Sequence, residues 1–437
     1  MQISQYRLLS VGFEAEILAG LRSAFDVRCA IAEDASAEVN WRALYSMQLE
    51  THAPEMSPEM MACFNAVKQH YLKFSDINSR RFYYVSAPQS ETYNAFVLSF
   101  YYCYKLIKQH SINLVIHANI PHEGFDFIIY QIACFLNINT LLCYQSIFSN
   151  RFFIADRVEN FGSLKNTPNL YEKESSNYEL PKTWFYMAGS NKDAAYNLKN
   201  LLAEVLRKPY RLPPALVRYA YAYQFRKQVA ALTSKPVKGE QYVYFPLHLQ
   251  PELTTSAFGG DYADQAFVVE LLSALLPAGV WIYLKENPKQ TEKQRDPFFY
   301  KRLSTLKNVR LLAREESSSA LIEGSIGVAT ITGTAGWEAL FYGKPVLVFG
   351  YAWYGDFPGV VRYAPTFYFN DFIQTAVPSS AYLVNELDNC IQKTGKGVID
   401  TNYQCLVKDF DAKINAQFVC QSISRFIQNN LSFSGKV

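Results

Sequence analysis

The chain has 437 residues, of which 49% are hydrophobic and 19% are charged, so it is long and apolar enough for two or three globular domains. Its formal net charge of +3, with no run of Lys or Arg, gives no support for nucleic-acid binding. No window reaches the roughly 18 to 20 apolar residues that span a bilayer, and the N-terminus lacks the apolar segment of a signal peptide. We therefore expect a cytoplasmic protein whose membrane contact, if any, is peripheral at the inner membrane face.

The first half of the chain predicts alternating strands and helices. Hydrophobic runs at 6–13, 112–119 and 138–145 are typical of strands, and the apolar segments 95–110 and 126–137 have helical length. A strand, a helix and a second strand in close succession require a parallel sheet with a right-handed crossover. The composition turns polar and irregular near 150–190, and a long helical segment then leads into a Pro/Gly/Lys linker near 233–240.

After residue 240 the alternation is more regular. Short helical segments separate predicted strands at 242–247, 280–286, 309–313, 326–332 and 345–350. This pattern is typical of a doubly wound parallel sheet. We predict an α/β fold with two Rossmann-like domains that face a cleft, an N-terminal one at 1–235 and a C-terminal one at 240–395. Residues 396–437 are expected to add a closing helix.

Polar side chains follow several of these strands, at the sheet edge where open α/β sheets bind ligands. They are His248, Gln250 and Glu252 after the first strand of the second domain, Lys285, Asn287 and Pro288 after the next, and the turn Thr332, Gly333, Thr334, Ala335 and Gly336 with Glu338 beyond it. A turn of small residues that enters a helix offers backbone N–H groups to an anion. A helix cap in a tight turn is the structural alternative for 332–336, and a first-turn carboxylate favoured by the helix dipole is the alternative for Glu338.

The first domain has a comparable segment, "HANIPHEGFDF" (117–127), after a predicted strand. It gathers His122, Glu123 and Asp126, and an imidazole beside a carboxylate is what general base chemistry needs. Asp126 alone could instead cap the helix that follows. No metal is expected, because the eight cysteines form no CxxC pair and the six histidines match no metal-binding motif.

Several of these motifs together resemble bacterial capsular-polysaccharide and surface-carbohydrate biosynthesis proteins, a grouping related to retaining β-Kdo transferases. They are "PHEGFDFIIYQIA", "YVYFPLHLQPELTT", "YLKENPKQ", "ATITGTAGWEAL", "GKPVLVFG" and "WYGDFPGVVRY". The resemblance implies a GT-B-like architecture and a glycosyltransferase that needs no metal or cofactor. Its donor would be CMP-Kdo or another nucleotide sugar, and its acceptor a glycan or glycolipid of the capsule or lipopolysaccharide.

The resemblance also assigns roles to residues. Lys285, Asn287 and Pro288 stand where such proteins carry a Lys-x-His-Pro motif near the donor phosphate, with Asn287 in place of the His. Glu252 and Thr254 are the nearest counterparts of an Asp nucleophile, and Glu252 would face the anomeric carbon. His122 and Glu123 would deprotonate or orient the acceptor hydroxyl. Two other functions remain open at this point: a sugar-nucleotide epimerase on the same scaffold, and a non-catalytic component of capsule assembly.

Overall fold

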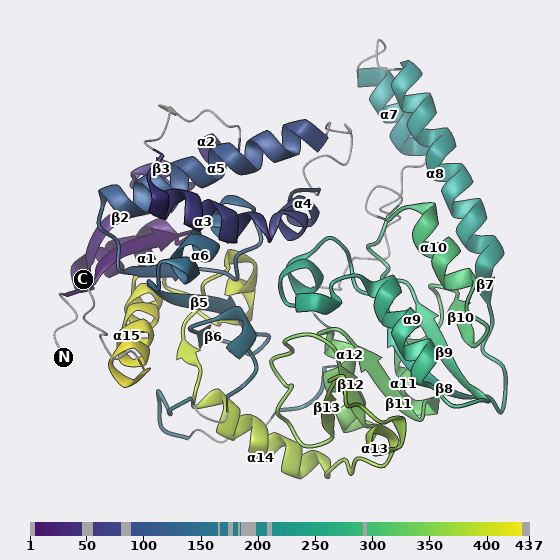
Figure 1. The fold of residues 1–437 in the computed structure, drawn as a ribbon. Helices are drawn as coiled ribbons and strands as arrows, with labels where there is room; N and C mark the ends of the chain where they lie inside the picture. The colour runs from purple at the N-terminus through teal and green to yellow at the C-terminus, as the bar shows by residue number, and fades with distance from the viewer. Residues whose placement is uncertain are drawn as a thin grey trace. The chain divides into compact units, whose positions relative to one another are not determined.

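The computed structural model describes residues 5–45, 56–79, 89–164, 167–173, 178–181, 184, 198–207, 212–291 and 295–430 (Figure 1). The chain forms two compact units. Unit 1 combines Met1–Ser176 with Asn385–Val437, and unit 2 is Asn177–Val384. Each unit contains one seven-stranded, mainly parallel sheet among its described residues, so the predicted α/β fold class with two parallel-sheet domains is confirmed.

The sheet of unit 1 has the strand order β14-β6-β5-β4-β1-β2-β3. Its strands are β1 (Arg7–Val11), β2 (Asp26–Ala32), β3 (Val39–Asn40), β4 (Leu114–His117), β5 (Asn139–Gln145), β6 (Arg151–Ala155) and β14 (Gly395–Lys396). Strand β6 is antiparallel to both of its neighbours, and the other pairs are parallel. The chain runs outward from β1 to β3 and returns to β4 on the other side of β1, so the strand order reverses between β1 and β4.

Both faces of this sheet are covered by helices. The helices are α1 (Ala15–Ala24), α2 (Trp41–Tyr45), α3 (Pro58–Lys68), α4 (Tyr71–Ser79), α5 (Gln89–Gln109), α6 (Phe125–Phe135) and α15 (Ala412–Asn430). Successive residues of β1 point to opposite faces, so Leu9 packs in a core with α3 to α6 whereas Leu8 packs in a core with α1 and α15. Helices α1 and α15 lie side by side, which brings segments from distant parts of the sequence together (Figure 1).

The sheet of unit 2 is parallel throughout and has the order β13-β12-β11-β8-β9-β10-β7. Its strands are β7 (Thr233–Ser234), β8 (Gln241–Pro246), β9 (Val280–Lys285), β10 (Val309–Leu312), β11 (Gly327–Thr330), β12 (Val346–Val348) and β13 (Val360–Arg362). The strand order reverses between β8 and β11. The sequences of β8 and β9 are mainly apolar on both faces of the sheet, because helices cover both sides of a parallel sheet.

Three helices of unit 2 begin at a residue whose polar side chain caps the helix. They are α7 (Leu198–Arg207), α8 (Leu212–Leu232), α9 (Gln265–Leu275), α10 (Pro297–Ser304), α11 (Ser318–Gly324), α12 (Thr334–Phe341) and α13 (Phe369–Ile373). Asp264, Asp296 and Ser317 accept hydrogen bonds from the first backbone N–H groups of α9, α10 and α11. Helix α14 (Ser380–Ile391) carries the chain from unit 2 back into unit 1.

The division between the units differs from the predicted domain boundaries at 235–240 and 395. Helix α8 was expected in the first domain, but Phe225 packs on Tyr300 in the core of unit 2, with ring centroids 5.7 Å apart. The predicted linker near 233–240 instead contains edge strand β7. At the other end, residues 385–437 belong to unit 1, because α15 completes one of its two cores. None of the described helices is long and apolar enough to cross a membrane.

Candidate functional site

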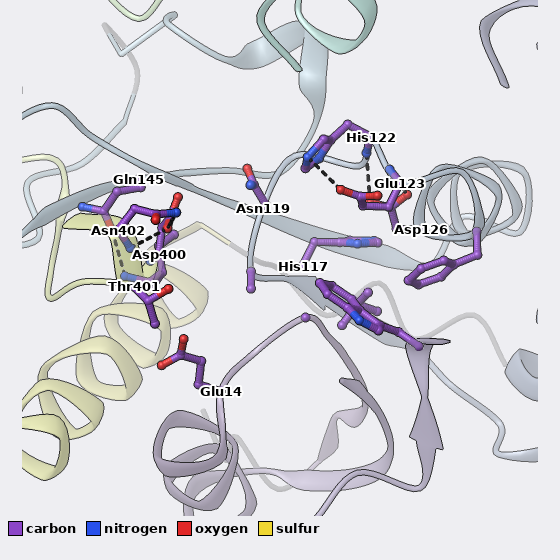
Figure 2. Close-up of a pocket in the computed structure, with 16 residues that line it drawn as sticks. Glu14, His117, Asn119, His122, Glu123, Asp126, Gln145, Asp400, Thr401 and Asn402 are labelled. Carbon is purple, nitrogen blue, oxygen red and sulfur yellow. Dashed lines mark hydrogen bonds and ion pairs between the residues drawn. The ribbon is translucent and has the colours of Figure 1, made fainter. Parts of the chain in front are cut away.

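Unit 1 contains a cavity of about 360 Å³ where its strand order reverses (Figure 2). Gly12 follows β1 and His117 ends β4, and these two adjacent carboxyl ends form part of its wall. Open α/β sheets bind ligands at this position, because the crossovers leave in opposite directions and open a crevice. The predicted residues His122, Glu123 and Asp126 all lie in the wall of the same cavity.

His122 and Glu123 form a close pair in the loop after β4. His122 Nδ1 lies 2.6 Å from the carbonyl oxygen of Ile120. A carbonyl oxygen only accepts hydrogen bonds, so Nδ1 carries the proton and Nε2 is the basic nitrogen of the neutral ring. This Nε2 lies 3.3 Å from Glu123 Oε1. An imidazole and a carboxylate at this distance are the pair of groups that general base chemistry uses.

Asp126 holds the shape of this loop. Its carboxylate accepts hydrogen bonds from the backbone N–H groups of His122 (2.9 Å), Glu123 (2.8 Å) and Phe127 (2.6 Å), and the side chain is buried. Gly124 begins α6 at φ +92°, and a Cβ atom there would lie 2.9 Å from the amide of Asn78. The predicted site residue Asp126 thus has a positioning role for the His122 and Glu123 pair.

His117 contributes a buried imidazole to the cavity wall. Its side chain is 1% exposed, and neither ring nitrogen has a hydrogen-bond partner among the described residues. Burial lowers the pKa of His117 to about 3, so the ring is neutral at physiological pH. A buried polar ring without partners costs free energy, which makes His117 a candidate ligand contact that the sequence did not single out.

The cavity also receives a segment from the C-terminal part of the chain. Gln145, the last residue of β5, accepts hydrogen bonds from the N–H groups of Ile399 (2.8 Å) and Asp400 (3.3 Å) and donates to the carbonyl of Arg151 (3.0 Å). Asp400 therefore lines the cavity together with Glu14 from the start of α1. Burial, Glu16 and Asp400 raise the pKa of Glu14.

In unit 2, the loops after β8 and β11 meet where the strand order reverses. His248 Nε2 lies 3.3 Å from the backbone nitrogen of Thr332 and 3.3 Å from Thr330 Oγ1. Because the Thr332 N–H donates, Nε2 is the unprotonated nitrogen. Burial lowers the pKa of His248 to about 4, so the ring stays neutral. The predicted donor segments around His248 and 332–336 thus lie together at one carboxyl edge.

Three glutamines fix the loop that follows β8. The amide of Gln265 brackets the backbone of His248, accepting from its N–H (2.7 Å) and donating to its carbonyl (3.2 Å). Gln290 brackets the backbone of Gln250 in the same way, at 2.9 and 3.0 Å. The side chain of Gln250 bonds Gln265 (2.8 Å) and the carbonyl of Ala263 (3.2 Å). Gln250, predicted to contact the donor, therefore also shapes this loop.

A buried ion pair joins the ends of β8 and β9. Arg295 Nη1 lies 2.9 Å from Glu286 Oε2, and the hydroxyl of Tyr300 donates to the same carboxylate at 2.6 Å. Arg295 Nη2 donates to the carbonyl of His248 at 2.9 Å. Both charged side chains are at most 3% exposed, so they depend on each other for compensation. Sequence reasoning missed this pair because Arg295 lies in a polar loop without a motif.

Lys285 and Glu338 lie near each other at the same edge. Lys285 Nζ donates to the carbonyl of Glu316 and to Ser318 Oγ, both at 2.7 Å. Burial lowers the pKa of Lys285, and the charges of Glu316 and Glu338 oppose that shift. Glu338 accepts a hydrogen bond from Trp184 Nε1 at 2.6 Å, and burial raises its pKa. Both predicted donor contacts are thus half-buried groups with protein partners.

Gly333 precedes α12 and fits closely against its neighbours. A Cβ atom at Gly333 would lie 2.9 Å from His248 Nε2. The Gly333 N–H donates to Thr330 Oγ1 at 3.1 Å, and its carbonyl accepts from the hydroxyl of Tyr354. Helix α12 starts at Thr334, and its N-cap residue is Gly333, which has no side chain to cap the helix. The structural alternative, a threonine as the helix cap, is therefore not observed.

Two predicted residues act in turns. Glu252, which the resemblance places at the anomeric carbon, is the N-cap residue of the short helical segment Leu253–Ala257, where it forms a capping box with Thr255. In this box the Thr255 hydroxyl accepts a hydrogen bond from the backbone N–H of Glu252 at 3.3 Å. Asn287 accepts from the N–H of Lys289 at 2.9 Å, which closes the turn that contains Pro288. Among the described residues, no group of His, Cys, Asp and Glu could hold a metal ion.

Comparisons with known proteins find one family model that is similar to part of the chain. Residues 187–382 match the family model described as capsule polysaccharide biosynthesis protein. No curated protein matches the chain.

Solved structures with a similar fold include the β-Kdo 2,4-transferase of Thermosulfurimonas dismutans KpsC, at 13% identity over 68% of this chain and 88% of that one, with a TM-score of 0.34. Anabaena HepE in complex with UDP-glucose is 13% identical over 96% and 99% of the two chains, at 0.28. The Methanocaldococcus jannaschii UDP-GlcNAc 2-epimerase in complex with UDP-GlcNAc and UDP is 8% identical over 97% and 99%, at 0.25. Residues 187–382, which include the sheet edge around His248, are therefore the part of this chain that is similar to capsule polysaccharide biosynthesis proteins.

Proposed function

We propose that this protein is a glycosyltransferase that moves a sugar from a nucleotide-activated donor to a growing bacterial surface polysaccharide. The observation that carries the proposal is the family match over 187–382, because that segment contains the His248, Lys285 and 332–336 loops gathered at one sheet edge. Each unit also has its polar residues where the strand order reverses, which is the ligand-binding position of open α/β sheets.

In this proposal the donor binds to unit 2. Lys285 supplies a positive charge for the donor phosphates, and the turn 332–336 supplies backbone N–H groups at the start of α12. Departure of the nucleotide leaves negative charge on phosphate, and fixed donors of this kind stabilise it as it develops. Glu252 and Asn287, which lie at the same sheet edge, would contact the sugar of the donor.

The acceptor binds to unit 1 in this proposal. A sugar hydroxyl placed near His122 Nε2 would lose its proton to that nitrogen as it attacks the anomeric carbon, and Glu123 would stabilise the resulting imidazolium. Asp126 and Gly124 keep the pair in place.

Nucleotide binding and sugar transfer test the proposal in two steps. Binding to the folded state alone raises the melting midpoint, so a thermal-shift screen of CMP, UDP and GDP identifies the nucleotide. Lys285→Ala should weaken its binding roughly ten- to a hundredfold, because a charged hydrogen bond to phosphate is lost. Lys301→Ala, an exposed lysine on α10, serves as the control.

Incubation with labelled sugar nucleotides then reports the reaction. Transfer to a polysaccharide primer supports the proposal. Epimerised sugar without transfer would make the protein an epimerase, and binding of no nucleotide would leave a non-catalytic assembly role.

A further inference from the structure

The cavity of unit 1 is lined by one sign of charge. Glu14, Glu123, Asp126 and Asp400 contribute carboxyl groups, and no Lys or Arg lies among the described residues of its wall. These residues come from three separate segments: the start of α1, the loop after β4, and the segment that Gln145 holds. A ligand that enters therefore meets carboxylate acceptors together with neutral amide and hydroxyl groups, and no side-chain ammonium or guanidinium group.

Glu14 is an exposed residue at the start of α1, where the helix dipole favours a carboxylate. It occupies the N-cap position of α1, yet its side chain makes no capping hydrogen bond. Figure 2 shows its carboxylate extending toward the segment of Asp400 and Thr401. Two carboxylates that face one cavity repel each other unless a ligand or solvent donates hydrogen bonds to both.

His117 provides an independent indication of a ligand. Its buried ring lines the cavity, and both of its nitrogens lack partners among the described residues. A neutral imidazole offers one donor and one acceptor, which matches a hydroxyl group, itself both donor and acceptor. Trp41 and Phe125 add apolar ring surface to the same wall, with centroids 6.4 Å apart.

We propose that this cavity binds an uncharged, hydroxyl-rich sugar unit of the acceptor and excludes acceptors whose terminal sugar is anionic. The inference rests on the proposed function, in which unit 1 holds the acceptor. Sugar hydroxyls donate to Glu14 and Asp400, and the apolar face of the ring packs on Trp41. The cavity volume of about 360 Å³ lies within the range of small-molecule sites, roughly 300 to 1,000 Å³. A carboxylate or phosphate in this space would lie close to several fixed negative charges without a compensating cation.

Matched pairs of sugars test this specificity in the full-length protein. Methyl glucoside, galactoside and mannoside are compared with the corresponding methyl uronides, which differ only in a carboxylate at C6. Saturation-transfer NMR titrations give the dissociation constants. We expect at least one neutral glycoside to bind and its uronide to bind at least tenfold more weakly. Equal or tighter binding of the uronide overturns the proposal, as does binding of neither member of any pair.

A charge reversal locates the effect. Glu14→Lys should raise the affinity for the uronide at least tenfold and weaken that for the neutral glycoside. Glu91→Lys makes the same charge change at an exposed position of α5, outside the cavity wall, and should leave both affinities unchanged. If Glu14→Lys does not fold, Glu14→Gln should still narrow the ratio between the two sugars. An unchanged ratio in a folded Glu14 variant overturns the proposal.

The outcome is separable from that of the proposed function. Nucleotide binding depends on unit 2, and the sugar pairs probe unit 1. Loss of sugar discrimination with intact transfer from a nucleotide sugar defeats only the acceptor inference. Discrimination without any transfer or nucleotide binding defeats the glycosyltransferase proposal and leaves a binding site for neutral sugars.

Discussion

One buried ion pair, Arg295 with Glu286, connects the loops at the edge of unit 2. Arg295 and Glu286 lie in the interior, and Tyr300 completes the hydrogen bonding of the carboxylate. Arg302, on α10, pairs with Glu270 at the surface instead, with its side chain 41% exposed. The two arginines belong to the same unit and differ mainly in burial, so they form a matched pair for measurement.

Arg295→Met should destabilise unit 2 by about 3 to 5 kcal/mol, because it leaves Glu286 buried and unpaired. Arg302→Met should cost less, about 1 kcal/mol, because solvent screens the pairs of Arg302 with Glu270 and Asp264. Urea unfolding monitored by tryptophan fluorescence gives both values. Similar losses in the two variants would show that Glu286 is not left uncompensated.

The two buried imidazoles, His117 and His248, should resist protonation. Burial holds their pKa values near 3 and 4, below the usual value of about 6.5. Between these values the unfolded chain binds protons that the folded chain does not, so stability falls as pH decreases from about 6.5, by about 1.4 kcal/mol per pH unit for each ring. NMR of the histidine Cε1–H groups should show two resonances that do not shift between pH 7.5 and 5. Six resonances that all titrate near pH 6.5 would contradict the burial of both rings.

A third prediction at this scale concerns the base. His122→Gln and Glu123→Gln should each lower the rate of transfer, by about a hundred- to ten-thousandfold for the residue that removes the proton. Both should leave nucleotide affinity unchanged, because the charge they stabilise appears only in the transition state. Rates of transfer and thermal shifts with the donor nucleotide separate these effects. Near-wild-type turnover in both variants refutes the assignment.

At the scale of elements, the short loop between β4 and α6 depends on one glycine. Gly124 and Gly279 have nearly equal φ angles, +92° and +90°, but a Cβ atom would meet Asn78 at Gly124 and nothing within 4 Å at Gly279. The backbone strain of an alanine is thus shared by both positions, and the steric conflict is specific to Gly124.

Gly124→Ala should therefore lower the stability of unit 1 by about 1 to 3 kcal/mol and reduce transfer, because the loop that carries His122 must shift. Gly279→Ala should cost less and spare activity. Thermal unfolding and transfer rates for both variants provide the comparison. An active, fully stable Gly124→Ala protein would mean that Asn78 yields without moving the loop.

The sequence predicted the strands that are buried on both faces more readily than the others. The runs that became β8, β9, β11 and β12 are mainly apolar, which identifies them without tertiary information. Strand β2 has polar residues in its first half, and β6 lies where the composition turns polar, so neither stood out.

The site was predictable to the same extent. Residues in the loops that follow a strand, such as His248 and His122, could be placed at a sheet edge from the strand pattern alone. Asp400 could not, because it reaches the cavity through hydrogen bonds between Gln145 and the backbone of a distant segment. The capping role of Glu252 was not predicted. It depends on the short helical segment that contains its partner Thr255, and the sequence does not specify that segment.

On the scale of the whole molecule, unit 1 is built from both ends of the chain. Val419, on α15, is fully buried in the core that this helix shares with the sheet, whereas Gln417 on the same helix is exposed. A change at Val419 therefore tests whether the units are stable separately.

Val419→Asp should destabilise unit 1 by about 3 kcal/mol or more, because it buries an unpaired charge, and should leave nucleotide binding by unit 2 intact. Gln417→Asp should change neither. Limited proteolysis with identification of the fragments, alongside the nucleotide-induced thermal shift, gives the readout. Loss of nucleotide binding in Val419→Asp would show that unit 2 depends on unit 1 for its fold.

The return of the C-terminal segment to unit 1 also sets an order of events during synthesis. Unit 2 is complete once residue 384 has left the ribosome, but the core face beneath α15 and the cavity wall around Asp400 await the last residues. At typical translation rates, the chain after residue 176 takes on the order of half a minute to appear. The nascent protein thus holds an unfinished first unit, with apolar surface of β1 and β4 uncovered, for that whole interval.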